Sequence, residues 1–181
     1  MEQSRGVGTS IENVRHYLSH LLAMAVLKKF PKAKLGIRPR IEYGFYYDFK
    51  LPKPISEADL GPLAQTMREL IVQKLDFKGK KVTASQAKRI FKDQPFKLDL
   101  MKEFVKEKKQ LTVYSTGPQR ILDSRFQILD SQSFVDLCRG GHVKNTSEIN
   151  PDAFRLTKIA GAYWRGDEKN PQLTRIYGAA F

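Results

Sequence analysis

The three histidines and the only cysteine of this sequence occur in two close pairs. His16 and His20 are four positions apart, as are Cys138 and His142. Two imidazoles joined by a thiolate and a third imidazole are a sufficient donor set for tetrahedral zinc. The same groups can instead hold a polar substrate and an attacking water without a metal, because histidine exchanges protons near neutral pH. The residue types therefore predict a hydrolytic or metal site.

The first pair belongs to a helix that we expect from Ile11 to about Phe30. Side chains four residues apart lie on the same helix face, so His16 and His20 point the same way. Between residues 17 and 27 only two side chains are polar, and a helix that is apolar nearly all round is buried. We therefore expect the pair to line an internal cavity; the alternative is two core histidines bonded to backbone carbonyls. A zinc protease is excluded, because Tyr17 replaces the required glutamate.

The second pair follows an expected strand, SFVDL, at residues 133–137. Two glycines between Cys138 and His142 favour a tight turn that brings the thiol and the imidazole to the same side. The alternative is a buried cysteine beside an unrelated turn.

The remaining chain is helical first and strand-rich later. An aromatic strand or bent hairpin is expected at 41–49, and Gly79 is expected to turn the chain. Further helices are expected at about 57–74, 83–92 and 98–109, the second opened by a capping box. Strand patterns dominate from Leu111 on, including RFQILD at 125–130. This order predicts an α+β fold with a mostly antiparallel sheet packed with helices. We expect a flexible lead-in at 1–10 and a single domain at 11–181.

Charge and composition limit the partners. Thirty-two Lys and Arg against 19 Asp and Glu give a net charge of +13, which indicates a polyanion binder, unless the lysines are only a solvated surface. No apolar run reaches the roughly 20 residues that span a bilayer, so no membrane is expected. A single cysteine cannot form an internal disulfide, which favours the cytoplasm.

Four motifs carry a family resemblance. HYLSHLLAMAV, IEYGFYYDF, SFVDLCRGGH and GAYWRGDEKNPQLTRIYGAAF, in this order, resemble the editing domain of bacterial threonyl-tRNA synthetases over about residues 11–181. The two pairs are also similar to those of alanyl-tRNA synthetase editing domains. The resemblance implies a cleft that hydrolyses serine wrongly attached to tRNA(Thr), in an excised or free-standing domain without the synthetic site.

The resemblance also implies residue roles. The expected catalytic residues are Lys97, His16 and Asp136. The residues expected to bind the aminoacyl group or the terminal adenosine are His20, Cys138, His142 and Tyr47. A lysine between the apolar residues 96 and 98 should have a lowered pKa if the cleft desolvates it.

The implied partners are the aminoacylated 3′ end of tRNA(Thr) and a synthetase core in the same or another chain. No cofactor is expected, because threonine-type domains work without metal; zinc on the quartet His16, His20, Cys138 and His142 is the alternative. Two further alternatives stay open, a non-catalytic tRNA-binding module and a zinc-dependent aminoacyl-ester hydrolase.

Finer expectations concern the pocket. Ala23 and Gly140 suit a filter that excludes threonine, and Tyr46 and Tyr47 either stack on the tRNA 3′ end or belong to the core.

The sequence departs from the family at two points. Gly141 replaces the usual proline, which loosens the turn that aims His142. Arg38 replaces the usual glycine before Pro39, which places a basic side chain near the pocket rim.

Overall fold

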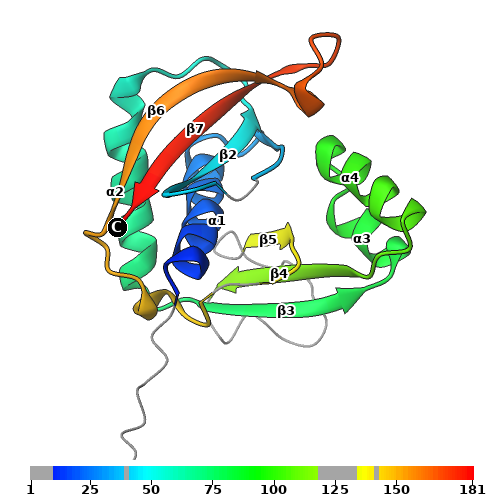
Figure 1. Ribbon diagram of the computed structural model, residues 1–181, viewed down its shortest axis with the longest axis horizontal. Helices are drawn as coiled ribbons and strands as arrows, with labels where there is room; N and C mark the ends of the chain where they lie inside the picture. Colours follow the sequence, from blue (N-terminus) through cyan, green and yellow to red (C-terminus); the bar gives the residue numbers. More distant parts are fainter. Residues whose placement is uncertain (1–9, 39–40, 118–133, 141–142) are drawn as a thin grey trace, which may run out of the picture.

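Two antiparallel sheets flank a buried helix in the computed structural model, which describes residues 10–38, 41–117, 134–140 and 143–181 (Figure 1). In the four-stranded sheet, the order is β1 (Lys34–Leu35), β2 (Gly44–Lys50), β7 (Gln172–Ala180) and β6 (Phe154–Tyr163). In the three-stranded sheet, it is β3 (Asp76–Val82), β4 (Leu111–Gly117) and β5 (Phe134–Leu137). All strand pairings are antiparallel. The predicted α+β class is confirmed.

The helices of the described residues match the expected segments closely. They are α1 (Ile11–Lys29), α2 (Leu60–Val72), α3 (Ala84–Ile90) and α4 (Pro95–Lys106). Short 3-10 turns occur at η1 (Glu57–Asp59), η3 (Thr146–Glu148) and η4 (Trp164–Gly166). None of these helices is both long and apolar enough to cross a lipid bilayer.

Helix α1 is the centre of the main core. The Ser10 side chain accepts a hydrogen bond from the backbone of Asn13 and so caps its first turn. Every residue from Tyr17 to Val26 is buried, as the nearly unbroken apolar run predicts. The helix packs against Phe45 and Phe49 of β2, and the same core cluster continues to Phe77 and Phe134 of the other sheet. Helix α1 thereby connects the two sheets, near the middle of Figure 1.

Helix α4 brings one candidate residue, Lys97, to the core. The helix expected at 98–109 begins three residues earlier, at Pro95, because proline is tolerated in the first helical turn. The capping box of α3 is confirmed, since Gln86 N donates to Thr83 Oγ1 at 3.2 Å and Thr83 N donates to Gln86 Oε1 at 2.9 Å. Trp164 from the GAYWRGD motif packs on Phe96 at 4.9 Å between ring centroids. The motif therefore supports the end of α4 that carries Lys97.

One local prediction is wrong. Gly79 does not turn the chain but lies within β3, paired with Tyr114 of β4. A Cβ atom at residue 79 would stand 2.6 Å from the Tyr114 ring, so the glycine allows close packing between strands. The predicted strand at 125–130 and residues 1–9 of the lead-in lie outside the described residues.

Candidate active site

Asp136, in the last strand of the three-stranded sheet, is the centre of the site. Its side chain is fully buried. Lys97 Nζ lies 2.8 Å from Oδ1, while Tyr47 Oη donates to Oδ2 at 2.8 Å and Arg38 Nε donates to Oδ2 at 3.1 Å. His20 Nδ1 faces the same oxygen at 3.3 Å. One carboxylate thus gathers groups from α1, α4, β2 and the loop after β1.

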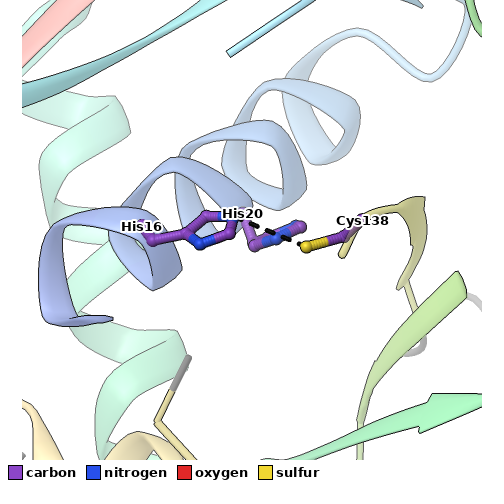
Figure 2. A group of neighbouring side chains, drawn as sticks. All are labelled: His16, His20 and Cys138. Atoms are coloured by element: carbon purple, nitrogen blue, oxygen red, sulfur yellow. Dashed lines mark hydrogen bonds between the residues drawn. The ribbon is translucent and has the colours of Figure 1, made fainter. Parts of the chain in front are cut away.

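His16, His20 and Cys138 meet beside the Asp136 carboxylate and form one cluster with Asp136 and its partners. The His16 and His20 rings stack with their centroids 5.3 Å apart, and His16 Nε2 lies 3.5 Å from Cys138 Sγ. Figure 2 shows the two imidazoles on helix α1 and the thiol that points toward them. The expected glycine turn is present at Gly140, which has φ +100° and donates its backbone N–H to Cys138 Sγ at 3.3 Å. The predicted convergence of the histidine pair with the thiol is therefore confirmed. His142 and Gly141 lie outside the described residues, so their expected roles stay predictions.

Arg38 is the residue whose importance the sequence did not reveal. We expected it near the pocket rim, but its guanidinium lies within the cluster. It bonds Asp136, donates from Nη2 to the Leu137 carbonyl at 3.3 Å and contacts His16 Nε2 through Nη1. The arginine in place of the usual glycine was the signal available in the sequence. A sequence motif gives the residue type, however, and does not give the position that a flexible side chain takes in the fold.

Burial and charge set the protonation of the cluster. Burial opposes ionisation of Asp136, but the neighbouring charges of Lys97 and Arg38 outweigh it and hold the pKa of the carboxyl well below its usual range. Burial lowers the pKa of Lys97 against the opposing effect of Asp136, as the apolar neighbours predicted. Burial also lowers the pKa of His20 to about 4, with a further contribution from Arg38.

These shifts define the proton positions at neutral pH. His20 is uncharged, and because a carboxylate only accepts hydrogen bonds, its Nδ1 carries the proton that faces Asp136. Burial raises the pKa of the Cys138 thiol despite the nearby Arg38 charge. The thiol is therefore protonated and is a poor nucleophile.

A cleft of about 330 Å³ reaches the cluster from outside. Of the described residues, it is lined by Glu12, Arg15, His16, Ser19, Arg38, Ile41, Glu42, Gly44 and Phe45. Lys97 and Asp136 are not in this lining and are 2% and 0% exposed. Arg38 and His16 thus stand between the cleft and the buried carboxylate.

The structure decides one alternative about the pocket and corrects one expectation, that for Ala23. Of the two alternatives for Tyr46 and Tyr47, membership of the core is confirmed, since these side chains are 8% and 0% exposed. Tyr46 packs on Tyr177 and under Arg175, and Tyr47 stacks on Phe49. Ala23 belongs to the main core, where the apolar run of α1 buries it.

The donor types fit zinc, but their surroundings do not. Ligand atoms of His16, His20 and Cys138 lie within 4.8 Å of one another, and imidazole and thiolate are common zinc ligands. However, Arg38 Nη1 contacts His16 Nε2, the same nitrogen that faces the thiol. A metal cation at this point would meet a permanent positive charge, so the cluster does not fit a metal while Arg38 stays in place.

Comparison with known proteins finds similarity to threonine-tRNA ligases. The family described as "Threonyl and Alanyl tRNA synthetase second additional domain" matches residues 111–177. A threonine-tRNA ligase of Borreliella burgdorferi is 46% identical over 164 residues, or 91% of this chain. Those of Treponema pallidum subsp. pallidum and Dehalococcoides mccartyi are 44% and 43% identical over 95% and 96% of it. The chain is thus similar to the part of threonine-tRNA ligases that contains the second additional domain, which its residues 111–177 match. It spans 26% of the length of each of these ligases.

The family match covers only part of the candidate site. Residues 111–177 include Asp136 and Cys138 but not His16 or Lys97. The ligase matches extend over nearly the whole chain and so include α1 and α4. The candidate site therefore combines residues inside the family match, Asp136 and Cys138, with residues outside it, His16 and Lys97.

Proposed function

We propose that this domain hydrolyses the ester bond of a wrongly charged tRNA and removes serine from tRNA(Thr). The observation that carries the proposal is the buried ion pair between Lys97 Nζ and Asp136 Oδ1, at 2.8 Å, beside the imidazole of His16. Ester hydrolysis needs a positioned water and a positive or donating group for the developing oxyanion. Similarity to a synthetase domain family supports an aminoacyl ester as the substrate.

Lys97 supplies the positive charge in this proposal. Asp136 holds the ammonium group, and the Tyr47 ring, 5.1 Å from Nζ, packs against it. In a buried site a fixed charge stabilises an oxyanion more strongly than it would in water. Asp136 and Tyr47 position the lysine, and His16 holds the attacking water.

Serine is the proposed substrate because synthetic sites discriminate poorly against it. Serine lacks one methyl group of threonine, and such a difference changes binding by only about 1–3 kcal/mol, a limit for which aminoacyl-tRNA synthetases are themselves the usual example. A second, hydrolytic site that admits serine but is too small for threonine would remove the wrongly attached serine from tRNA(Thr). We assign this confinement to Cys138 and the turn at Gly140, which lie next to His16.

The basic surface supports tRNA as the polyanionic partner. The net charge is +13, and four lysines of the α4 region are solvent-exposed: Lys102, Lys106, Lys108 and Lys109. Cationic side chains that neutralise phosphates release counterions and so increase affinity. We propose that these groups hold the acceptor end of tRNA(Thr), with a synthetase core as the further partner, in the cytoplasm.

The reaction is proposed to proceed without a metal. No step needs a metal, because the ammonium group of Lys97 supplies the positive charge that zinc would otherwise provide. The alternative of a tRNA-binding module without turnover is favoured by one observation, the burial of Lys97 and Asp136 behind Arg38. The experiment below separates these possibilities.

Deacylation of seryl-tRNA(Thr) and threonyl-tRNA(Thr) tests the proposal. We expect the wild-type chain to hydrolyse the seryl ester selectively and Lys97→Met to lose hydrolysis while retaining tRNA binding. Lys88→Met is the matched control, because Lys88 is exposed on the neighbouring helix α3 and is not one of the four lysines assigned to the tRNA; it should keep both hydrolysis and tRNA binding. Binding without ester loss by the wild type would support the non-catalytic module, and loss of both esters at equal rates would contradict serine specificity.

A further inference from the structure

We propose that Arg38 closes the inner end of the cleft and competes with the ammonium group of the substrate for the same hydrogen-bond acceptors. In this proposal the Arg38 side chain blocks the inner end of the cleft and rotates away before an aminoacyl ester enters. The identity of the ligand rests on the proposed function, whereas the closure itself is a property of this chain.

The acceptors around Arg38 form a site for a cation. Its guanidinium donates to Asp136 Oδ2 at 3.1 Å and to the Leu137 carbonyl at 3.3 Å, and it contacts His16 Nε2. A guanidinium only donates hydrogen bonds, so Nε2 is the unprotonated nitrogen of His16. A carboxylate oxygen, a carbonyl oxygen and an imidazole nitrogen are three acceptors, and a primary ammonium group has three N–H donors.

Arg38 also decides which groups the cleft reaches. Its side chain is 10% exposed and lines the cleft together with His16. Asp136 and Lys97, directly behind it, are 0% and 2% exposed. A substrate in the cleft therefore reaches the proposed catalytic pair only after the guanidinium has moved.

Departure of Arg38 leaves the buried carboxylate with partners. Asp136 keeps Lys97 at 2.8 Å, Tyr47 at 2.8 Å and His20 at 3.3 Å. An entering ammonium group replaces one cation by another, so the charge of the site is unchanged and no buried charge is left without a counterpart.

The backbone before Arg38 is held while its side chain extends into the site. Gly36 N donates to the Asp48 carbonyl at 2.7 Å, and Asp48 N donates to the Ile37 carbonyl at 3.0 Å. These bonds fix the chain to β2 up to residue 37. Rotation about the side-chain bonds of Arg38 is then sufficient to open the cleft, because arginine has many accessible rotamers.

Alkylation of Cys138 by N-ethylmaleimide tests the closure without any tRNA. The chain has one cysteine, so every adduct reports this site, and Cys138 is 6% exposed beside His16. Rates are compared per thiolate, with the thiolate fraction taken from the pH profile of each protein, because loss of the Arg38 charge by itself raises the pKa of the Cys138 thiol. On this scale we expect Arg38→Ala to react at least about tenfold faster than the wild type, as when a minor open state becomes the major one. Arg38→Met, which keeps side-chain length without charge, should lie between them.

Arg15→Ala is the matched control. Arg15 lines the same cleft, but its guanidinium donates to the Ala180 carbonyl at 3.0 Å and not to the cluster. Its loss should leave the alkylation rate unchanged. An unchanged or slower rate in Arg38→Ala would overturn the proposal.

Guanidinium ion separates opening of the cleft from unfolding. In Arg38→Ala, millimolar guanidinium chloride should slow alkylation, because the free ion occupies the vacated acceptors. If the fast reaction instead reports a destabilised fold, millimolar salt will leave the rate unchanged, because guanidinium unfolds proteins only at roughly molar concentrations. An unchanged rate would therefore also overturn the proposal.

Steady-state deacylation then tests the competition with substrate. Removal of Arg38 should lower the KM for seryl-tRNA(Thr) by about tenfold without lowering kcat, because apparent affinity scales with the open fraction. A lowered kcat with unchanged KM would show that Arg38 assists the reaction and would overturn the competition. If neither protein hydrolyses the ester, the proposed function fails, while the alkylation result still decides the closure.

Discussion

Lys97 and Asp136 form an ion pair of 2.8 Å between the first turn of α4 and the end of β5, and both side chains are almost completely buried. They are 39 positions apart in sequence. The proposed chemistry needs this contact, and it therefore depends on how α4 is placed relative to the three-stranded sheet.

Asp136→Asn should strongly destabilise the fold. The substitution leaves the buried cations Lys97 and Arg38 without their anion, and breaking a buried ion pair from one side costs about 3–5 kcal/mol. Urea unfolding at neutral pH measures the loss. Asp99→Asn is the control, because the Asp99 side chain is 46% exposed in its pair with Arg165 and an exposed pair contributes about 0–1 kcal/mol. Equal losses in the two variants would contradict the central role of Asp136.

His20 should make stability depend on pH between about 6.5 and 4. Its pKa is lowered to about 4 in the folded state, against about 6.5 in an unfolded chain. Within this window the unfolded state binds a proton that the folded state does not, so stability is complete above the upper value and falls as pH decreases. The loss approaches about 3 kcal/mol at pH 4.

Urea unfolding of wild type and His20→Gln at pH 7 and pH 5 checks this. The wild type should lose stability between the two values, and the variant should lose less. A wild type as stable at pH 5 as at pH 7 would show that His20 is not held uncharged. Asp136 acts at lower pH, because its depressed pKa confers stability that is lost only as pH falls below its unfolded value of about 3.9.

Trp164→Ala should disturb the site from a distance. Trp164 Nε1 donates to Asp99 Oδ2 at 3.0 Å, and its ring packs on Phe96, next to Lys97. Removing a buried tryptophan side chain costs about 3–5 kcal/mol, and hydrolysis should fall because α4 loses its support. Tyr163→Ala is the control, since Tyr163 is 44% exposed; similar effects of both would contradict this support.

Affinity for tRNA should decrease steeply with salt. Each neutralised phosphate contributes a slope of about −0.7 to −0.9 to the plot of log K against log salt. Filter binding or fluorescence anisotropy between 50 and 200 mM salt, about the range over which this effect is usually measured, gives the slope. A flat plot would show that the exposed lysines do not contact the nucleic acid.

Zinc content should change with Arg38. The wild-type chain, purified without chelators, should hold well below one zinc per chain, because the guanidinium contacts His16 Nε2. Arg38→Ala should bind more zinc, measured by elemental analysis after dialysis. One zinc per wild-type chain would contradict the metal-free mechanism.

Local patterns in the sequence were sufficient for the elements. The apolar run of α1, the capping box at Thr83 and the alternating strands after Leu111 each depend on neighbours a few residues away, and each is present within the described residues. Gly79 was misread because its reason is non-local: the Tyr114 ring of the adjacent strand occupies the space of its missing side chain.

The sequence by itself determined which groups are available: the paired histidines, the single thiol with its glycine turn, Lys97, and an excess of positive charge. Only the tertiary structure decided that Asp136 is the common partner of Lys97, Tyr47 and His20, and that Arg38 also bonds to it. The physical reason is that periodicity and turn preferences act within single elements. The contacts of a buried carboxylate, by contrast, depend on how five segments pack, and the end point of a long arginine depends on which acceptors that packing places within its reach.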